Sequence, residues 1–109
     1  MMANLKKYEQ TFCRQTKSLM IGLQKNLEIL AKNPQNKQAL KDCLLNFHTL
    51  KGSAGAMECK GLENFVIKAE KDIKNPNNIL QLKSSCQEIE SLAGDFRLLC
   101  RFAPRNDKS

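Results

Sequence analysis

Apolar residues between Lys37 and Met57 recur at alternating steps of three and four, and this spacing constrains the fold more than any other feature. Six residues carry the pattern: Leu40, Cys43, Phe47, Leu50, Ala54 and Met57. Such steps keep apolar side chains on one face of an α-helix, as in a bundle helix that buries a seam against its neighbours. The spacing therefore predicts a helix over residues 37–57 with one buried face.

The rest of the chain has the same periodicity. Before Lys32 it predicts a short first helix and a longer second one, with a bend near Thr16, because residues 14–18 contain no apolar anchor. The apolar spacing predicts two more helices, over residues 62–73 and 79–100, and the last one is long and is ended by Pro104. Asn-Pro turns at residues 33–36 and 75–78, and a connection at 58–61 with Gly61 as helix breaker, separate these elements.

No stretch shows the apolar alternation of a β-strand, and 109 residues suffice for one core. Short connections between long helices imply antiparallel neighbours. We therefore predict an all-α protein, an antiparallel up-down four-helix bundle with a short extra N-terminal helix. We expect a single domain over residues 1–109, with the bundle over about 4–102 and a loose polar tail over 103–109.

Composition narrows the class of partner. Hydrophobic residues make up 41% of the chain, no apolar run is long enough to span a membrane, and the N-terminus has no signal-peptide block. We expect a cytoplasmic protein that does not bind membranes. The net charge of +7 suits nucleic acid, an anionic membrane surface or an acidic protein partner. Because the lysines are dispersed and the aromatic residues are only five Phe and one Tyr, we favour the protein partner over nucleic acid.

The five cysteines are widely spaced and form no CxxC pair, and a single histidine cannot complete a zinc site with such scattered thiols. We expect no metal. We also expect all five cysteines to be reduced and to act as small apolar residues.

His48 is the only histidine in the chain, and it follows the seam residue Phe47, so it should point toward the bundle surface. Lys51, Gly52 and Gly55 follow it by three, four and seven residues and share its face of the helix. Each helical glycine costs roughly 0.5–1 kcal/mol relative to alanine, so two of them need a reason. We interpret the small residues as access for a partner to His48; a structural or merely solvated histidine is the alternative.

An unprotonated imidazole can act as a nucleophile, a base or a ligand. No nucleophile-elbow pattern surrounds His48 and no GxxxxGK[ST] loop is present, so we expect neither a hydrolytic triad nor autonomous ATP use. A histidine that accepts a phosphoryl group fits better, with Lys51 offsetting the charge of the phosphoryl oxygens. Glu70 should lie level with His48 on the neighbouring antiparallel helix, where its carboxylate would bind Nδ1–H and leave Nε2 reactive.

The run His48-Thr49-Leu50-Lys51-Gly52-Ser53-Ala54-Gly55 resembles the HxLKGSA signature of histidine-containing phosphotransfer (HPt) domains of bacterial two-component systems. The helical layout is similar to the phosphotransfer domain of chemotaxis histidine kinases. This resemblance implies phosphorylation of His48 on Nε2, with Lys51 beside it and Glu70 hydrogen-bonded to the imidazole. The chain departs from the family at Glu58, where glycine is usual, and at residues 14–17, where Arg14 and Lys17 stand in a region that is often acidic.

From these observations we expect a phosphocarrier, not an enzyme, that exchanges a phosphoryl group between His48 and aspartates of receiver domains. Its partners would be receiver domains and a sensor or hybrid histidine kinase, and the chain would be a monomer. We expect no cofactor on this chain, with Mg²⁺ on the receiver. The expected docking patch consists of Leu44, Leu45, Gly52 and Gly55. The alternatives are an HPt-fold regulatory module that is not phosphorylated, and a small basic nucleic-acid-binding protein.

Overall fold

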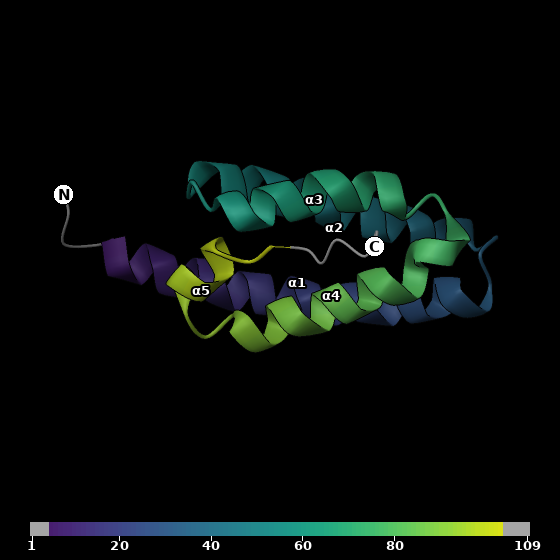
Figure 1. Ribbon diagram of the computed structural model, residues 1–109, viewed down its shortest axis with the longest axis horizontal. Coiled ribbons are helices and arrows are strands. Elements are labelled where there is room, and N and C mark those ends of the chain that lie inside the picture. The colour runs from purple at the N-terminus through teal and green to yellow at the C-terminus, as the bar shows by residue number, and fades with distance from the viewer. Residues whose placement is uncertain (1–4, 104–109) are drawn as a thin grey trace.

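The computed structural model describes residues 5–103. Its elements are α1 (Leu5–Lys32), α2 (Lys37–Ala56), α3 (Lys60–Asp72), a 3₁₀ turn η2 (Pro76–Asn78), α4 (Ile79–Leu92) and α5 (Phe96–Cys100). In Figure 1 the pair α2 and α3 lies above the pair α1 and α4, and the short α5 lies near the first half of α1. Residues 5–103 contain no strand, which confirms the all-α prediction.

The predicted seam of α2 is buried. Cys43, Phe47, Leu50 and Ala54 are fully buried, whereas Leu40 and Met57 are half-buried and pack against the same core. The ring of Phe47 meets that of Phe65 on α3 edge to face, with centroids 6.2 Å apart. Because the seam lies between α1 and α3, the opposite face of α2 is left to solvent.

The first helix is continuous, so the predicted bend near Thr16 and the short extra N-terminal helix are wrong. Thr16 and Cys13 occupy core positions of α1 and are both buried, so Thr16 fills the place of the apolar anchor that residues 14–18 lack. The Thr16 hydroxyl finds no hydrogen-bond partner among the described residues, at a cost of about 1–3 kcal/mol. Residues 14–18 thus continue the helix, because Thr16 is small enough to be buried at the position where the period requires an inward-facing side chain.

The extra helix lies at the C-terminal end of the bundle, because the long last helix predicted over 79–100 is interrupted. α4 ends at Leu92, Gly94 is exposed, and the Asp95 side chain caps α5 by accepting a hydrogen bond from Arg97 N at 2.9 Å. Gly94 favours the end of one helix and Asp95 favours the start of the next, and the apolar period, which continues across both, does not reveal this break. The predicted stop at Pro104 and most of the predicted tail lie outside the described residues.

The connection between α2 and α3 turns at Glu58, with φ of 55°, and no other non-glycine described residue has a positive φ. Gly61 was predicted to break the helix here, but it lies in the first turn of α3 and is buried. A Cβ at Gly61 would lie 2.5 Å from the carbonyl oxygen of Phe102. Gly61 is therefore needed for the close approach of the C-terminal segment, and the left-handed turn falls on Glu58.

Two of the cysteines are not reduced, which corrects the sequence-based expectation. Cys59, immediately before α3, is disulfide-bonded to Cys100 at the end of α5. Cys13, Cys43 and Cys86 are free and buried, as expected of small apolar residues. Burial raises the pKa of both Cys43 and Cys86 to about 12, so these thiols stay neutral.

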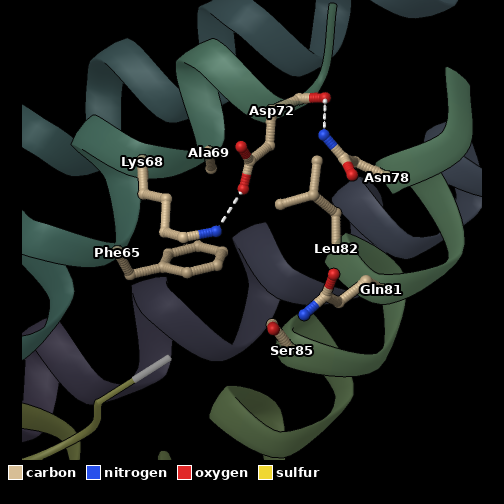
Figure 2. Close-up of a pocket in the computed structure, with 8 residues that line it drawn as sticks. All are labelled: Phe65, Lys68, Ala69, Asp72, Asn78, Gln81, Leu82 and Ser85. Carbon is tan, nitrogen blue, oxygen red and sulfur yellow. Dashed lines mark hydrogen bonds and ion pairs between the residues drawn. The ribbon is translucent and has the colours of Figure 1, made fainter. Parts of the chain in front are cut away.

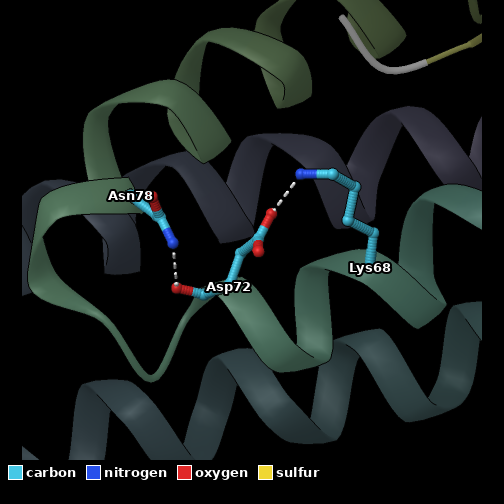
Figure 3. Close-up of polar contacts among 3 residues, drawn as sticks. All are labelled: Lys68, Asp72 and Asn78. Atoms are coloured by element: carbon cyan, nitrogen blue, oxygen red, sulfur yellow. Dashed lines mark hydrogen bonds and ion pairs between the residues drawn. The ribbon is translucent and has the colours of Figure 1, made fainter. Parts of the chain in front are cut away.

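A narrow crevice separates the second half of α3 from α4 (Figure 2). Its volume is about 10 Å³, room for no more than one water molecule. Polar groups close its edge: Lys68 Nζ lies 2.6 Å from Asp72 Oδ2, and Asn78 Nδ2 donates to the Asp72 carbonyl at 3.4 Å (Figure 3). Its size excludes a ligand. The Lys68–Asp72 pair lies within α3, and the contact of Asn78 with Asp72 joins the end of α3 to the residue before α4.

Candidate functional site

His48 is exposed in the middle of α2, one residue after the fully buried Phe47. Its predicted orientation toward the surface is confirmed. Among residues 5–103 the imidazole makes no hydrogen bond, so both ring nitrogens are open to a partner. Exposure alone does not show that a histidine is functional. The residues on the two sides of α2 that flank His48 therefore decide what it can do.

On the α3 side, the structure brings Lys51 and Glu70 together. Lys51 Nζ lies 3.3 Å from Glu70 Oε1, and the two side chains are 41% and 28% exposed. At this exposure the ion pair contributes no more than about 1 kcal/mol, so it orients the lysine more than it stabilises the fold. Glu70 comes from the predicted helix and faces α2, but the contact it makes is with Lys51. Its hydrogen bond to His48 stays a prediction.

The two predicted access glycines differ. A Cβ at Gly52 would meet no atom within 4 Å, so this position opens directly to solvent beside His48. A Cβ at Gly55 would lie 3.2 Å from Glu63 Oε2, and that carboxylate also pairs with Lys60 at 3.7 Å. Gly52 therefore leaves space for a partner, whereas the space at Gly55 is taken up by the Glu63 side chain of α3.

The two leucines on the turn before His48 are also unequal. Leu45 is 62% exposed, one of the most exposed large apolar side chains described. Leu44 is half-buried and packs against the core. Of the predicted docking patch, Leu45 and Gly52 thus offer the most surface.

On the α1 side, a groove of about 460 Å³ runs beside the His48 stripe, and the sequence-based reasoning missed it. Its walls come from both helices, and although most of the lining residues are polar, the surface they present to the groove is mainly apolar: Gln15, Ser18, Leu19, Gly22, Asn46, Thr49 and Ser53. Gly22 was the available signal, because a glycine in mid-helix leaves a hollow; a Cβ there would approach only Asn46 Nδ2, at 3.9 Å. The groove extends the open surface around His48 toward α1.

Within residues 5–103 no three His, Cys, Asp or Glu side chains are grouped so that they could hold a metal ion. None of the described helices is long and apolar enough to cross a membrane.

A protein-family model, described as Hpt domain, matches residues 8–92. That span runs from the first turn of α1 to the last residue of α4, and it includes His48 and both flanking sides of α2. Comparisons with curated proteins and with solved structures gave no match.

Proposed function

The chain belongs to the Hpt domain family, and from that premise we propose that it accepts a phosphoryl group on His48 and exchanges it with an aspartate of a receiver domain. Hpt domains carry out histidine phosphotransfer in two-component phosphorelays, as phosphocarriers that interact with kinases and receiver domains. The observation that carries the proposal is the exposed imidazole of His48, which stands one turn before a cation and an open glycine inside the matched span.

In the transfer we propose, the Nε2 lone pair of His48 attacks the phosphorus of an aspartyl phosphate on the receiver. The bond from phosphorus to the carboxylate oxygen breaks, and the aspartate leaves as a carboxylate with the bonding electron pair. The imidazole then carries the phosphoryl group on Nε2 and a proton on Nδ1. Attack by the aspartate of a second receiver reverses these steps and regenerates the free histidine. Mg²⁺ and the acidic pocket would belong to the receiver.

Lys51 and Glu70 would assist this exchange from one side of His48. The Lys51 ammonium lies one helical turn from the imidazole, where it would offset the charge of the phosphoryl oxygens. The contact with Lys51 uses Oε1 of Glu70, which leaves Oε2 as an acceptor for Nδ1–H. A carboxylate in that role favours the tautomer with an unprotonated Nε2 and stabilises the positive charge that develops on the ring.

The docking surface would consist of Leu45 and Gly52 around His48, with Leu44 and Gly55 at its α3 side. Leu45 offers apolar area, and the open position of Gly52 lets the receiver's catalytic loops come close. The net charge of +7 would steer the chain toward the acidic pocket of a receiver and raise the association rate at low ionic strength.

The test is phosphotransfer from a panel of purified receivers, each carrying ³²P on its aspartate. We expect label on this chain in a form that is acid-labile and base-stable, as for phosphohistidine. His48→Gln should take up no label while its circular dichroism matches the wild type. Absence of label from every receiver in the panel, or equal labelling of wild type and H48Q, would overturn the proposal.

Lys51→Gln and Glu70→Gln separate the supporting roles. Each should leave binding of the receiver unchanged and slow the transfer, by about tenfold for a loss of roughly 1.4 kcal/mol of transition-state stabilisation. If Glu70 acts only by holding Lys51, then E70Q should have no further effect in a K51Q background. An additional loss in that background supports a direct hydrogen bond to the imidazole.

A further inference from the structure

A second groove, which we call the end groove, lies between the first half of α1 and the link from α4 to α5. Its volume is about 850 Å³, and α1 contributes residues from Leu5 to Lys17 to one wall. That stretch spans about 18 Å, at about 1.5 Å per residue, which is enough to hold three turns of a helix. Residues Ala93 to Arg97 form the opposite wall.

The floor of the end groove is apolar. Cys13 and Ala93 are buried there, and Phe96 is half-buried, held by an edge-to-face contact with Phe12 at a centroid distance of 5.8 Å. Leu5 forms the rim and is 50% exposed. The exposed part of this apolar strip thus comes mainly from Leu5 and Phe96, and nothing among the described residues covers it.

Cations surround this strip. Lys6, Arg14, Lys17 and Arg97 all line the end groove, and none of them forms an ion pair within residues 5–103. Two carboxylates lie among them, Glu9 and Asp95, and Asp95 is engaged as the N-cap of α5. The groove therefore carries an excess of unpaired positive charge around an apolar floor.

We propose that the end groove is a docking site for an acidic amphipathic helix of a partner protein. Its apolar face would pack on Leu5 and Phe96, above the buried Cys13 and Ala93, while its carboxylates would pair with the cations that line the groove. This is the helix-in-groove mode of recognition, with charge complementarity that sets the orientation.

Other occupants fit less well. A second copy of this chain would bring another +7 net charge to a positive groove. Among the described residues only one aromatic ring, that of Phe96, lines the groove, so a nucleic acid would find little to stack on. An anionic membrane binds a projecting apolar face, whereas Cys13, Ala93 and Phe96 lie at the bottom of a groove.

The end groove and the His48 face lie on different sides of α1. The groove uses the stripe that contains Lys6, Cys13 and Lys17, whereas the side of α1 next to α2 presents Ser18 and Gly22. At about 100° per residue these two stripes are on opposite sides of the helix. A partner in the end groove would therefore leave His48 accessible, and tethering it there would raise its effective concentration at the phosphoacceptor.

The experiment uses the full chain and a fluorescein-labelled synthetic helix of about 14 residues, with leucines on one face and glutamates on the other. We expect saturable binding by fluorescence anisotropy that weakens with salt, and amide shift changes in ¹⁵N NMR spectra at residues 5–17 and 93–97. Binding to H48Q should equal binding to the wild type, so the result does not depend on phosphotransfer. Shift changes centred on α2 instead would overturn the proposed site.

The variant is R14E/K17E/R97E, and its matched control is K25E/K32E/K37E, which reverses three exposed lysines away from the groove. Both variants have the same net charge. R14E/K17E/R97E should weaken binding at least about tenfold, and K25E/K32E/K37E should weaken it less than about threefold. Because the net charges are equal, such a difference would come from the position of the reversed charges. Equal weakening in both would show non-specific attraction and overturn the proposal. The milder R14Q/K17Q/R97Q variant should give the same ranking if charge reversal perturbs the fold.

Competing probes decide the class of partner. A peptide with lysine in place of glutamate, a duplex of about 15 base pairs and phosphatidylglycerol vesicles are titrated under the same conditions. Weaker binding of all three than of the acidic helix supports the proposal. Tighter binding of the duplex or the vesicles at residues 5–17 and 93–97 would assign the groove to nucleic acid or membrane and overturn it.

Discussion

Gly52 and Gly61 lie nine residues apart on the two sides of the α2–α3 connection, and they serve opposite purposes. Gly52 is exposed beside His48, and a Cβ there would meet nothing within 4 Å. Gly61 is buried, and its Cβ would lie within 3 Å of three backbone atoms of the C-terminal segment. The fold requires glycine at position 61 but would tolerate a larger residue at position 52. Packing therefore explains Gly61, whereas Gly52 is explained only by a partner that must come close to His48.

The same contrast holds for the regions around them. The outward face of α2 carries exposed groups without structural partners, His48 and Leu45 among them. The junction of α3 with α5 is closed by the Cys59–Cys100 disulfide, by Gly61 and by Phe102, whose ring contacts Phe65 with centroids 5.8 Å apart. Changes at the junction should therefore act on stability, and changes on the outward face should act on phosphotransfer.

The largest expected effect on stability comes from opening the disulfide. The bond closes a loop with a sequence separation of 41, and the chain-entropy model for such a loop gives roughly 4 kcal/mol. Reduction should lower the free energy of unfolding by about this amount, as measured by urea denaturation with and without a dithiol reductant. The double variant C59A/C100A should not respond to the reductant. An unchanged midpoint for the reduced wild type would show that the junction is held by packing alone.

Gly61→Ala should cost about 1–3 kcal/mol, because the added methyl group must push the backbone near Phe102 away from α3. Thermal or urea unfolding of the oxidised protein measures the loss. Gly94→Ala is the matched control, since Gly94 is exposed with open space at its Cβ position. Equal stability of G61A and wild type would contradict the close approach of the C-terminal segment.

Glu58→Gly should raise stability by about 1 kcal/mol. Glu58 is held in the left-handed region at φ 55°, which costs a non-glycine residue roughly 1–2 kcal/mol, and glycine recovers part of that cost despite its greater freedom in the unfolded chain. The control is Glu88→Gly, which places glycine inside α4 and should destabilise by about 1 kcal/mol. A loss of stability in E58G would contradict the turn geometry.

The smallest effect on stability is expected at Gly52, and it should run opposite to the effect on transfer. Gly52→Ala should stabilise the helix by about 0.5–1 kcal/mol, since its methyl group meets no atom. Gly52→Gln should also fold but slow phosphotransfer at least about tenfold, because a long side chain fills the space beside His48. Ala56→Gln, exposed at the end of the same helix, should leave the transfer rate unchanged. Undiminished transfer by G52Q would remove the access role of this glycine.

Sequence patterns predicted α2 most accurately. Its apolar steps placed Cys43, Phe47, Leu50 and Ala54 inside and His48 outside, and the helix runs over Lys37–Ala56 against the predicted 37–57. The prediction succeeded because a long helix with a regular seam has one way to bury its apolar face. The first and last helices were less accurately predicted, since Thr16 replaces an apolar anchor without breaking α1, and Gly94 with Asp95 breaks a helix whose apolar period continues.

The candidate site was predicted in part. The residues on α2 follow from local spacing, and Glu70 was correctly expected to face that helix. The contact of Glu70 with Lys51 depends on the position of α3 along the axis of α2, and the α2–α3 turn sets this position. Neither groove was foreseen, because each has walls from helices far apart in the sequence.

The sequence by itself determined the helical period, the inward and outward faces of α2, and the exposed position of His48 next to a cation and an open glycine. Tertiary structure alone decided the Cys59–Cys100 pairing, the Lys51–Glu70 contact, the role of Gly61 and both grooves. The physical reason is the distance along the chain over which each interaction acts. Periodicity and capping act over a few residues, whereas these contacts depend on how whole helices are positioned by the packing of the common core.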